Sequence, residues 1–387
     1  MSNFEYYKAK AIDLKRRLQW IEQCIASAGK DHQGILSWLK GTQSKILCEL
    51  TTIDKLVQKG HPRYLTIIMR KHVVLEMAMW EATLFAGTLM RERINERRIA
   101  KVVDKSSREL LIPLNDFLVS IGDGPAVVIG KSSNPLFHFR DESLGSAYTW
   151  VAIFHEIGHV AIRQDRQDIL SNLIGIVHQH FRTERNSIGP VNQDRRTQIE
   201  KAISSAEDYW TRGGSSIRLE ELFCDCFATY TAGLAYIFKL LDLGIWLVDY
   251  PRYIDLCDEH PPLLARFEAC WHILPDAIKS SDFGISLDKI STDYLALASS
   301  KPNPELQYGT VCKEQLINAL TDECVRLIRS HWPALQQYQD TPALTSLGNA
   351  QDTPLAQILN FLFANMLRDQ EAYFRLEEQV IIDIFNT

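Results

Sequence analysis

The sequence lacks any long apolar run of the kind that crosses a membrane. Its most apolar stretch, residues 231–248, is interrupted by Lys239 and Asp242, whereas a membrane-spanning helix needs about 20 predominantly apolar residues. Residues 1–8 also lack the apolar centre of a signal peptide. We therefore expect residues 231–248 to form a buried helix, in a protein that is neither exported nor bound to a membrane.

Clusters of basic residues and a disulfide framework are missing as well. The 387 residues carry a formal net charge of −6 and contain no long run of Lys and Arg. This makes nucleic acid a poor candidate for a partner. The eight cysteines are scattered along the chain without paired spacings. Together with the lack of an export signal, this pattern predicts reduced thiols and a cytoplasmic protein.

The sequence does contain a His-Glu-x-x-His motif, which begins at His155. Residues four apart share one face of a helix, so His155 and His159 can both offer an imidazole nitrogen to one metal ion. Glu156 lies beside that face, where it can act as a general base on a water molecule at the metal. Gly158 is unfavourable inside a helix by about 1 kcal/mol relative to alanine. We therefore expect another backbone to approach the helix closely at this position.

A second predicted helix, Arg218–Ala228, supplies carboxylates with the same spacing. Glu221 would complete a set of two histidines and one carboxylate, which is typical of zinc sites that keep a fourth position for water. Asp225, one turn later, can accept a hydrogen bond from the other ring nitrogen of a histidine ligand. Cys224 and Cys226 flank Asp225, but residues two apart on a helix cannot both face one ion. We interpret them as buried thiols.

These motifs resemble those of the gluzincin metallopeptidases, over residues from about 120 to 270. A further segment, His260–Arg266, is similar to the His-Pro-Pro…Arg segment of the CAAX-processing and heat-shock membrane proteases. Similar three-part signatures occur in the bacterial Lit-type and ImmA/IrrE-type proteases, which fit a chain without a membrane span. The resemblance implies that His260 is the oxyanion partner. It also implies that Arg266 contacts the substrate or a residue behind the ligands.

The motifs and the resemblance predict a zinc-dependent endopeptidase that hydrolyses a protein or peptide substrate. The bacterial relatives suggest a regulated protease of stress response or phage defence. A second hypothesis stays open because helical flanks make up so much of the chain. In that hypothesis the chain is a non-catalytic scaffold that binds a protein partner and keeps a Zn²⁺ ion only for structure. Glu156 argues against it, since a structural site has no use for that carboxylate.

Apolar periodicity predicts a mainly α fold with a small β-sheet. We expect a helical N-terminal region (1–115), a zincin-like metallopeptidase core (116–275) and a helical C-terminal region (276–387). Outside the motifs, the expected helices cover residues 34–56, 64–99, 169–181, 316–332, 335–339, 355–367 and 374–384. Residues 275–310 read as rich in loops.

Three further features of the sequence bear on the predicted cleft. Residues 136–140 have strand composition, and we expect them to form a sheet edge on which a substrate strand could add. The polar residues 182–196 are expected to form a surface loop or flap that could control access. His138, His178 and His180 are interpreted as structural or exposed, because the ligand set is complete without them.

Overall fold

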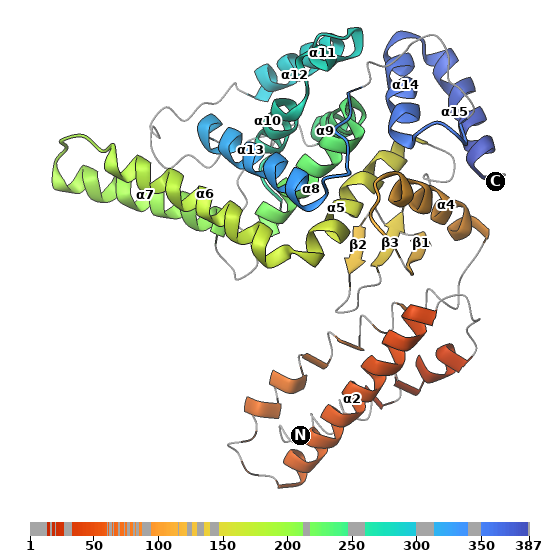
Figure 1. The fold of residues 1–387 in the computed structure, drawn as a ribbon. Helices are drawn as coiled ribbons and strands as arrows, with labels where there is room; N and C mark the ends of the chain where they lie inside the picture. The colour runs from red at the N-terminus through yellow and green to blue at the C-terminus, as the bar shows by residue number, and fades with distance from the viewer. Residues whose placement is uncertain are drawn as a thin grey trace. The chain divides into compact units, whose positions relative to one another are not determined.

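A computed structural model shows a mainly α fold with one small sheet, as predicted (Figure 1). It describes residues between 14 and 385, outside the segments 27–32, 87–93, 122–125, 130–134, 140–146, 212–216, 247–259, 299–312 and 340–349 and shorter gaps, most of them between 16 and 84. The chain forms two compact units, Met1–Ala100 with Pro113–Asp141, and Lys101–Ile112 with Glu142–Thr387. The strands thus group with the N-terminal helices, and the C-terminal helices group with the motif helices. This division cuts across the one expected at residues 115 and 275.

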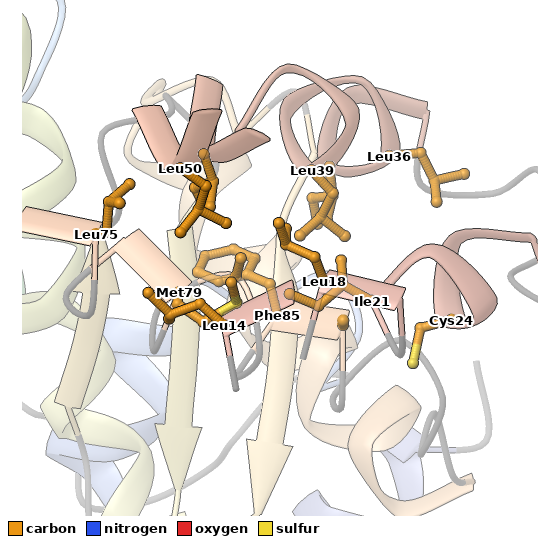
Figure 2. Close-up of a cluster of buried hydrophobic side chains, with 14 of the residues drawn as sticks. Leu14, Leu18, Ile21, Cys24, Leu36, Leu39, Leu50, Leu75, Met79 and Phe85 are labelled. Carbon is orange, nitrogen blue, oxygen red and sulfur yellow. The ribbon is translucent and has the colours of Figure 1, made fainter. Parts of the chain in front are cut away.

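The first unit is built on a long helix, α2 (Gln33–Lys59), close to the predicted range 34–56. Its buried residues recur at helical spacing, for example Ile35, Leu39, Ile46 and Leu50. They pack in an apolar cluster with residues from other segments of the unit, including Leu14, Leu18, Ile21, Met79 and Phe85 (Figure 2). The predicted helix 64–99 is described only in part, but its described residues from 66 to 86 are helical, and α4 (Ile94–Glu109) overlaps its end.

The sheet has three strands, β1 (Leu118–Ile121), β2 (Ala126–Ile129) and β3 (Pro135–Phe139), in the order β1-β3-β2. β3 pairs in parallel with β1 and antiparallel with β2. The prediction that residues 136–140 form a sheet edge is therefore wrong. Leu136, Phe137 and Phe139 are all buried. Because successive side chains of a strand point to opposite faces, both faces of β3 are covered, which is typical of a central strand.

The second unit is organised around the two motif helices, α5 (Ala152–Gln164) and α8 (Ile217–Ala232), which pack on each other. A 3-10 turn, η4 (Ala147–Val151), leads into α5. The expected close approach at Gly158 is confirmed. A Cβ atom at that position would lie 3.1 Å from the Cα atom of Cys224, in the middle of α8. Helices α9 (Leu234–Trp246), α10 (Leu263–Ile273), α13 (Glu314–His331) and α14 (Leu355–Arg368) also contact α8.

Between the two motif helices the chain forms a long helical hairpin, α6 (Arg166–Asn186) and α7 (Gln193–Thr211), whose helices lie side by side (Figure 1). The predicted helix 169–181 is part of α6, but the flap expected at residues 182–196 does not form. Only residues 187–192 connect the two helices. Residues 182–186 continue the helix, because Glu184 is buried one turn after Phe181 and accepts a hydrogen bond from Lys313 at 2.7 Å.

A left-handed turn joins α8 to α9. Gly233 has φ +62°, and a Cβ atom there would lie 2.4 Å from the Tyr338 ring. Leu234, Ile237 and Leu240 are buried, so the described part of the apolar stretch 231–248 forms the expected buried helix. No helix within the described segments is both long and apolar enough to cross a membrane.

The C-terminal part of the second unit is more helical than expected at one place and less so at another. α11 (Asp276–Lys279) and α12 (Asp282–Ala298) occupy the region expected to be rich in loops. Conversely, residues 335–339 are not helical, because the backbone N–H of Tyr338 donates instead to the carbonyl oxygen of Tyr230, at 2.7 Å. The helices predicted at 316–332, 355–367 and 374–384 correspond to α13, α14 and α15 (Gln370–Phe385).

Candidate metal centre

The three predicted ligands meet where α5 and α8 pack together. His155 and His159 project from α5, and Glu221 projects from α8. His155 Nε2 lies 3.2 Å from Glu221 Oε2, and His159 Nε2 lies 3.3 Å from Glu221 Oε1. One ligand atom from each residue lies within 4.8 Å of the other two. This group of side chains can hold a metal ion.

The far side of His155 is fixed by two buried partners. Its Nδ1 atom lies 3.0 Å from Asp225 Oδ1 and 3.0 Å from the hydroxyl of Tyr236. That hydroxyl donates to Asp225 Oδ1, at 2.5 Å, so it can only accept from the imidazole. In the neutral imidazole, this arrangement places the ring proton of His155 on Nδ1, so that Nε2 can offer its lone pair to a metal ion shared with Glu221.

Asp225 is itself held by an arginine. Arg266 donates from Nε to Oδ2 at 2.6 Å and from Nη2 to Oδ1 at 2.8 Å, and both residues are buried. Burial alone would raise the pKa of Asp225, but the guanidinium group and His155 hold it well below its usual range. Of the two contacts expected for Arg266, with substrate or with a residue behind the ligands, the structure shows the second.

His159 has a corresponding partner, which the sequence reasoning missed. Its Nδ1 atom lies 3.3 Å from Glu220 Oε1, and Arg166 donates to Glu220 Oε2 at 2.8 Å. The pKa of Glu220 is lowered because these two partners outweigh its burial. The only available signal was that Glu220 precedes Glu221. Arg166 lies in another helix, and nothing in the spacing connects it to the motif.

The pKa values of the two histidines show that this pocket favours positive charge. Burial alone would lower the pKa of His155, but the adjacent carboxylates of Asp225 and Glu221 raise it to about 9. The pKa of His159 is also raised against the effect of burial, by Cys224, Glu220 and Glu221. The same contacts hold the pKa of Glu221 well below its usual range.

The donor set and its surroundings fit a bound divalent cation. Glu221 Oε2 is buried and makes no hydrogen bond among the described residues, although His155 Nε2 lies nearby. Among the described residues, the ion pairs around the two histidines bring together three carboxylates, Glu220, Glu221 and Asp225, and two guanidinium groups, Arg166 and Arg266. With neutral histidines, these five groups carry a formal charge of −1. A divalent cation would offset this negative charge and give the unpaired Glu221 Oε2 a partner.

Glu156 and His260 are the remaining predicted residues. Glu156 follows His155 in α5 and is buried, with 8 % of its surface exposed. His260 lies before α10, and its side chain is 50 % exposed, with Nε2 3.5 Å from Glu221 Oε2. The helix that follows has Pro262 as its N-cap and no side-chain capping bond. His260 therefore does not serve as the cap of α10.

Of the other cysteines and histidines singled out in the sequence, those whose side chains the structure describes do not join the ligand group. Cys224 and Cys226 are buried, as expected, and burial raises the pKa of the Cys224 thiol to about 12. His178 is half exposed and pairs with Glu207, in the hairpin of α6 and α7. His180 Nε2 is buried without a hydrogen bond among the described residues. The side chain of His138 lies outside what the structure describes.

No protein-family model, curated protein or solved structure matches this chain.

Proposed function

We propose that the chain is a zinc-dependent endopeptidase. One observation carries the proposal. Both imidazoles turn Nε2 toward Glu221 while a carboxylate holds Nδ1 on their other side. Two imidazoles that are each oriented by an outer partner, together with one carboxylate, are typical of catalytic zinc sites. His155, His159 and Glu221 would hold the ion.

When bound, zinc would lower the pKa of a water molecule toward neutrality and polarise the carbonyl group of the substrate. Glu156 would accept the proton of the attacking water on its carboxylate and then deliver it to the nitrogen of the leaving amine. His260 would donate a hydrogen bond to the substrate carbonyl oxygen as negative charge develops there. Its half-exposed position beside Glu221 supports this role, since a substrate can reach it from solvent.

Asp225, Arg266 and Tyr236 would not touch the substrate. They keep His155 in the tautomer that a metal requires, and their burial makes this orientation rigid. By resemblance to the Lit-type and ImmA/IrrE-type proteases, we further propose a regulated enzyme of stress response or phage defence that cuts few proteins.

The test compares wild type with Glu156→Gln. Both proteins should contain zinc, because Glu156 is not a ligand. Mapping of new protein termini in expressing cells should find cleavage products only with the wild type. Glu200→Gln is a matched control, because Glu200 is a surface carboxylate paired with Arg196, and it should cleave normally. Identical termini in wild type and Glu156→Gln, or none in wild type, would contradict the proposal.

Metal analysis tests the ligand set separately. Glu221→Ala should lose most of its zinc, since only two imidazoles would remain. Full zinc occupancy in this variant would mean that the third ligand lies elsewhere. Zinc bound by wild type without any cleavage would instead favour the scaffold hypothesis.

A further inference from the structure

Both histidine ligands are supported by a carboxylate–arginine pair, but the two pairs differ in origin. Asp225 and Arg266, which support His155, belong to the motifs found in the sequence. Glu220 and Arg166, which support His159, do not. His159, Glu220 and Arg166 come from α5, α8 and α6, so the second pair ties the start of the α6–α7 hairpin to the ligand helices.

The two pairs also differ in their exposure to water. Side-chain exposure is 0 % for Asp225 and 9 % for Arg266, but 17 % for Glu220 and 37 % for Arg166. Arg166 reaches Glu220 Oε2 through both Nε and Nη2, at 2.8 Å each. This contact restrains one oxygen of the carboxylate and leaves Oε1 for His159 Nδ1.

We propose that Glu220, held by Arg166, is a positioning residue for the metal centre. Its carboxylate keeps the proton of His159 on Nδ1, so that Nε2 offers its lone pair to the metal. A charged acceptor also makes the imidazole a stronger ligand. Arg166 acts only through Glu220. The inference rests on the metal site of the proposed function and not on peptide cleavage.

The chain contains a matched control outside the metal centre. In the same hairpin, His178 Nδ1 lies 2.6 Å from Glu207 Oε1, and Arg185 pairs with the other oxygen of Glu207. Side-chain exposure in this pair is 35 % for Arg185 and 15 % for Glu207, close to the values for Arg166 and Glu220. It is therefore the same combination of residue types, with a similarly buried carboxylate and arginine, around a histidine that is more exposed than His159 and is not a metal ligand.

The experiment measures zinc affinity of the full-length protein by competition with a chelator, and the visible spectrum after loading with Co²⁺. Glu220→Ala should weaken zinc binding by about 10- to 100-fold and change the cobalt spectrum. Glu220→Gln should lose less zinc affinity than Glu220→Ala, because the amide oxygen of glutamine can still accept a hydrogen bond from His159 Nδ1. Arg166→Gln should also lose less zinc affinity than Glu220→Ala. The double variant Arg166→Gln/Glu220→Ala should bind zinc with the same affinity as Glu220→Ala alone. Glu207→Ala should bind zinc like wild type.

Several results would overturn the inference. Glu220→Ala could bind zinc as tightly as wild type, or Glu207→Ala could lose as much, which would indicate a general loss of stability. Additive losses in the double variant would mean that Arg166 does not act through Glu220. If Glu220→Ala fails to fold, Glu220→Gln and Arg166→Gln carry the test. A wild type that does not bind zinc would overturn the proposed function itself, whereas a zinc-binding wild type beside an unaffected Glu220→Ala overturns only this inference.

Discussion

At the scale of single residues, the tautomer of each imidazole matters as much as its position. A histidine ligand needs its proton on the nitrogen away from the metal, and a neutral imidazole can carry it on either one. Here both Nδ1 atoms face carboxylate oxygens, and both Nε2 atoms face Glu221. The surrounding side chains thus select the form of each ring that can bind a metal.

Tyr236→Phe should weaken zinc binding, because it removes the hydroxyl that bridges His155 and Asp225. Since Asp225 remains, we expect a loss of up to about 10-fold, the low end of the range for such outer contacts. The metal-free protein should lose about 1 kcal/mol of unfolding free energy with the hydrogen bond. Tyr373→Phe, which removes a buried bond to Glu377 at 2.7 Å, is the control. It should lose similar stability and no zinc affinity, and equal zinc affinities in the two variants would contradict the role of Tyr236.

His260→Ala tests the proposed contact with the developing oxyanion. That interaction exists mainly in the transition state, so kcat should fall by about 10²- to 10³-fold while KM and zinc content change little. Peptide-cleavage kinetics and thermal melts on the same protein provide the measurement. His272→Ala, an exposed histidine of α10 bonded to Asp322, should behave like wild type. Normal turnover with a lowered melting temperature would remove His260 from the mechanism.

At the scale of helices, the distance between α5 and α8 sets the geometry of the centre, and Gly158 sets that distance. Gly158→Ala would bring a Cβ atom to 3.1 Å from Cys224 Cα and 3.3 Å from its Sγ atom. We expect overpacking to reduce the unfolding free energy by about 1–3 kcal/mol and to weaken zinc binding as the helices separate. Urea unfolding and chelator competition measure the two effects.

Gly175→Ala is the control for this substitution. Gly175 lies in α6, and a Cβ atom there meets nothing within 4 Å. Alanine is the better helix former, so this variant should gain up to about 1 kcal/mol. If Gly158→Ala were as stable as Gly175→Ala, close packing would not be the reason for the glycine.

The sequence was most informative about helices that carry a strong local pattern. The spacing of histidines and carboxylates identified α5 and α8, and apolar periodicity identified α2, α13 and α14. It failed where the outcome depends on distant partners. β3 (Pro135–Phe139) is a central strand because β1 and β2 pair on both sides of it, and residues 335–339 are not helical because Tyr338 bonds to Tyr230. Neither partner can be read from the local sequence.

The same reasoning explains which parts of the metal centre were found. His155, His159, Glu221 and Asp225 stand at i, i+4 spacings within two helices, which a pattern can reveal. The other residues that orient the histidines are Glu220, Arg166 and Tyr236. They come together around the histidines only when α5, α6, α8 and α9 pack, so no local pattern reveals them. Arg266 was found through resemblance, but only the structure shows that it pairs with Asp225.

At the scale of the whole molecule, the ligands all belong to the second compact unit. Zinc that binds only the folded state should therefore stabilise that unit, by about 2.7 kcal/mol at a free concentration one hundred times Kd. Scanning calorimetry should show that a chelator lowers the transition of the second unit and leaves that of the first in place. Glu221→Ala should melt like the chelated wild type. A zinc-dependent shift that persists in Glu221→Ala would contradict the assignment of the ligands.

The turn at Gly233 has a consequence for sequence divergence. The residue carries no reactive group, yet its left-handed backbone, at φ +62°, reverses the chain after α8 so that Tyr236 meets Asp225. Any side chain there would be strained and would collide with Tyr338. As relatives of this chain drift apart, the glycine should persist for as long as the histidines do. A search pattern that adds Gly-x-x-Tyr, eight residues after the aspartate, would then separate chains with this ligand support from chance occurrences of His-Glu-x-x-His.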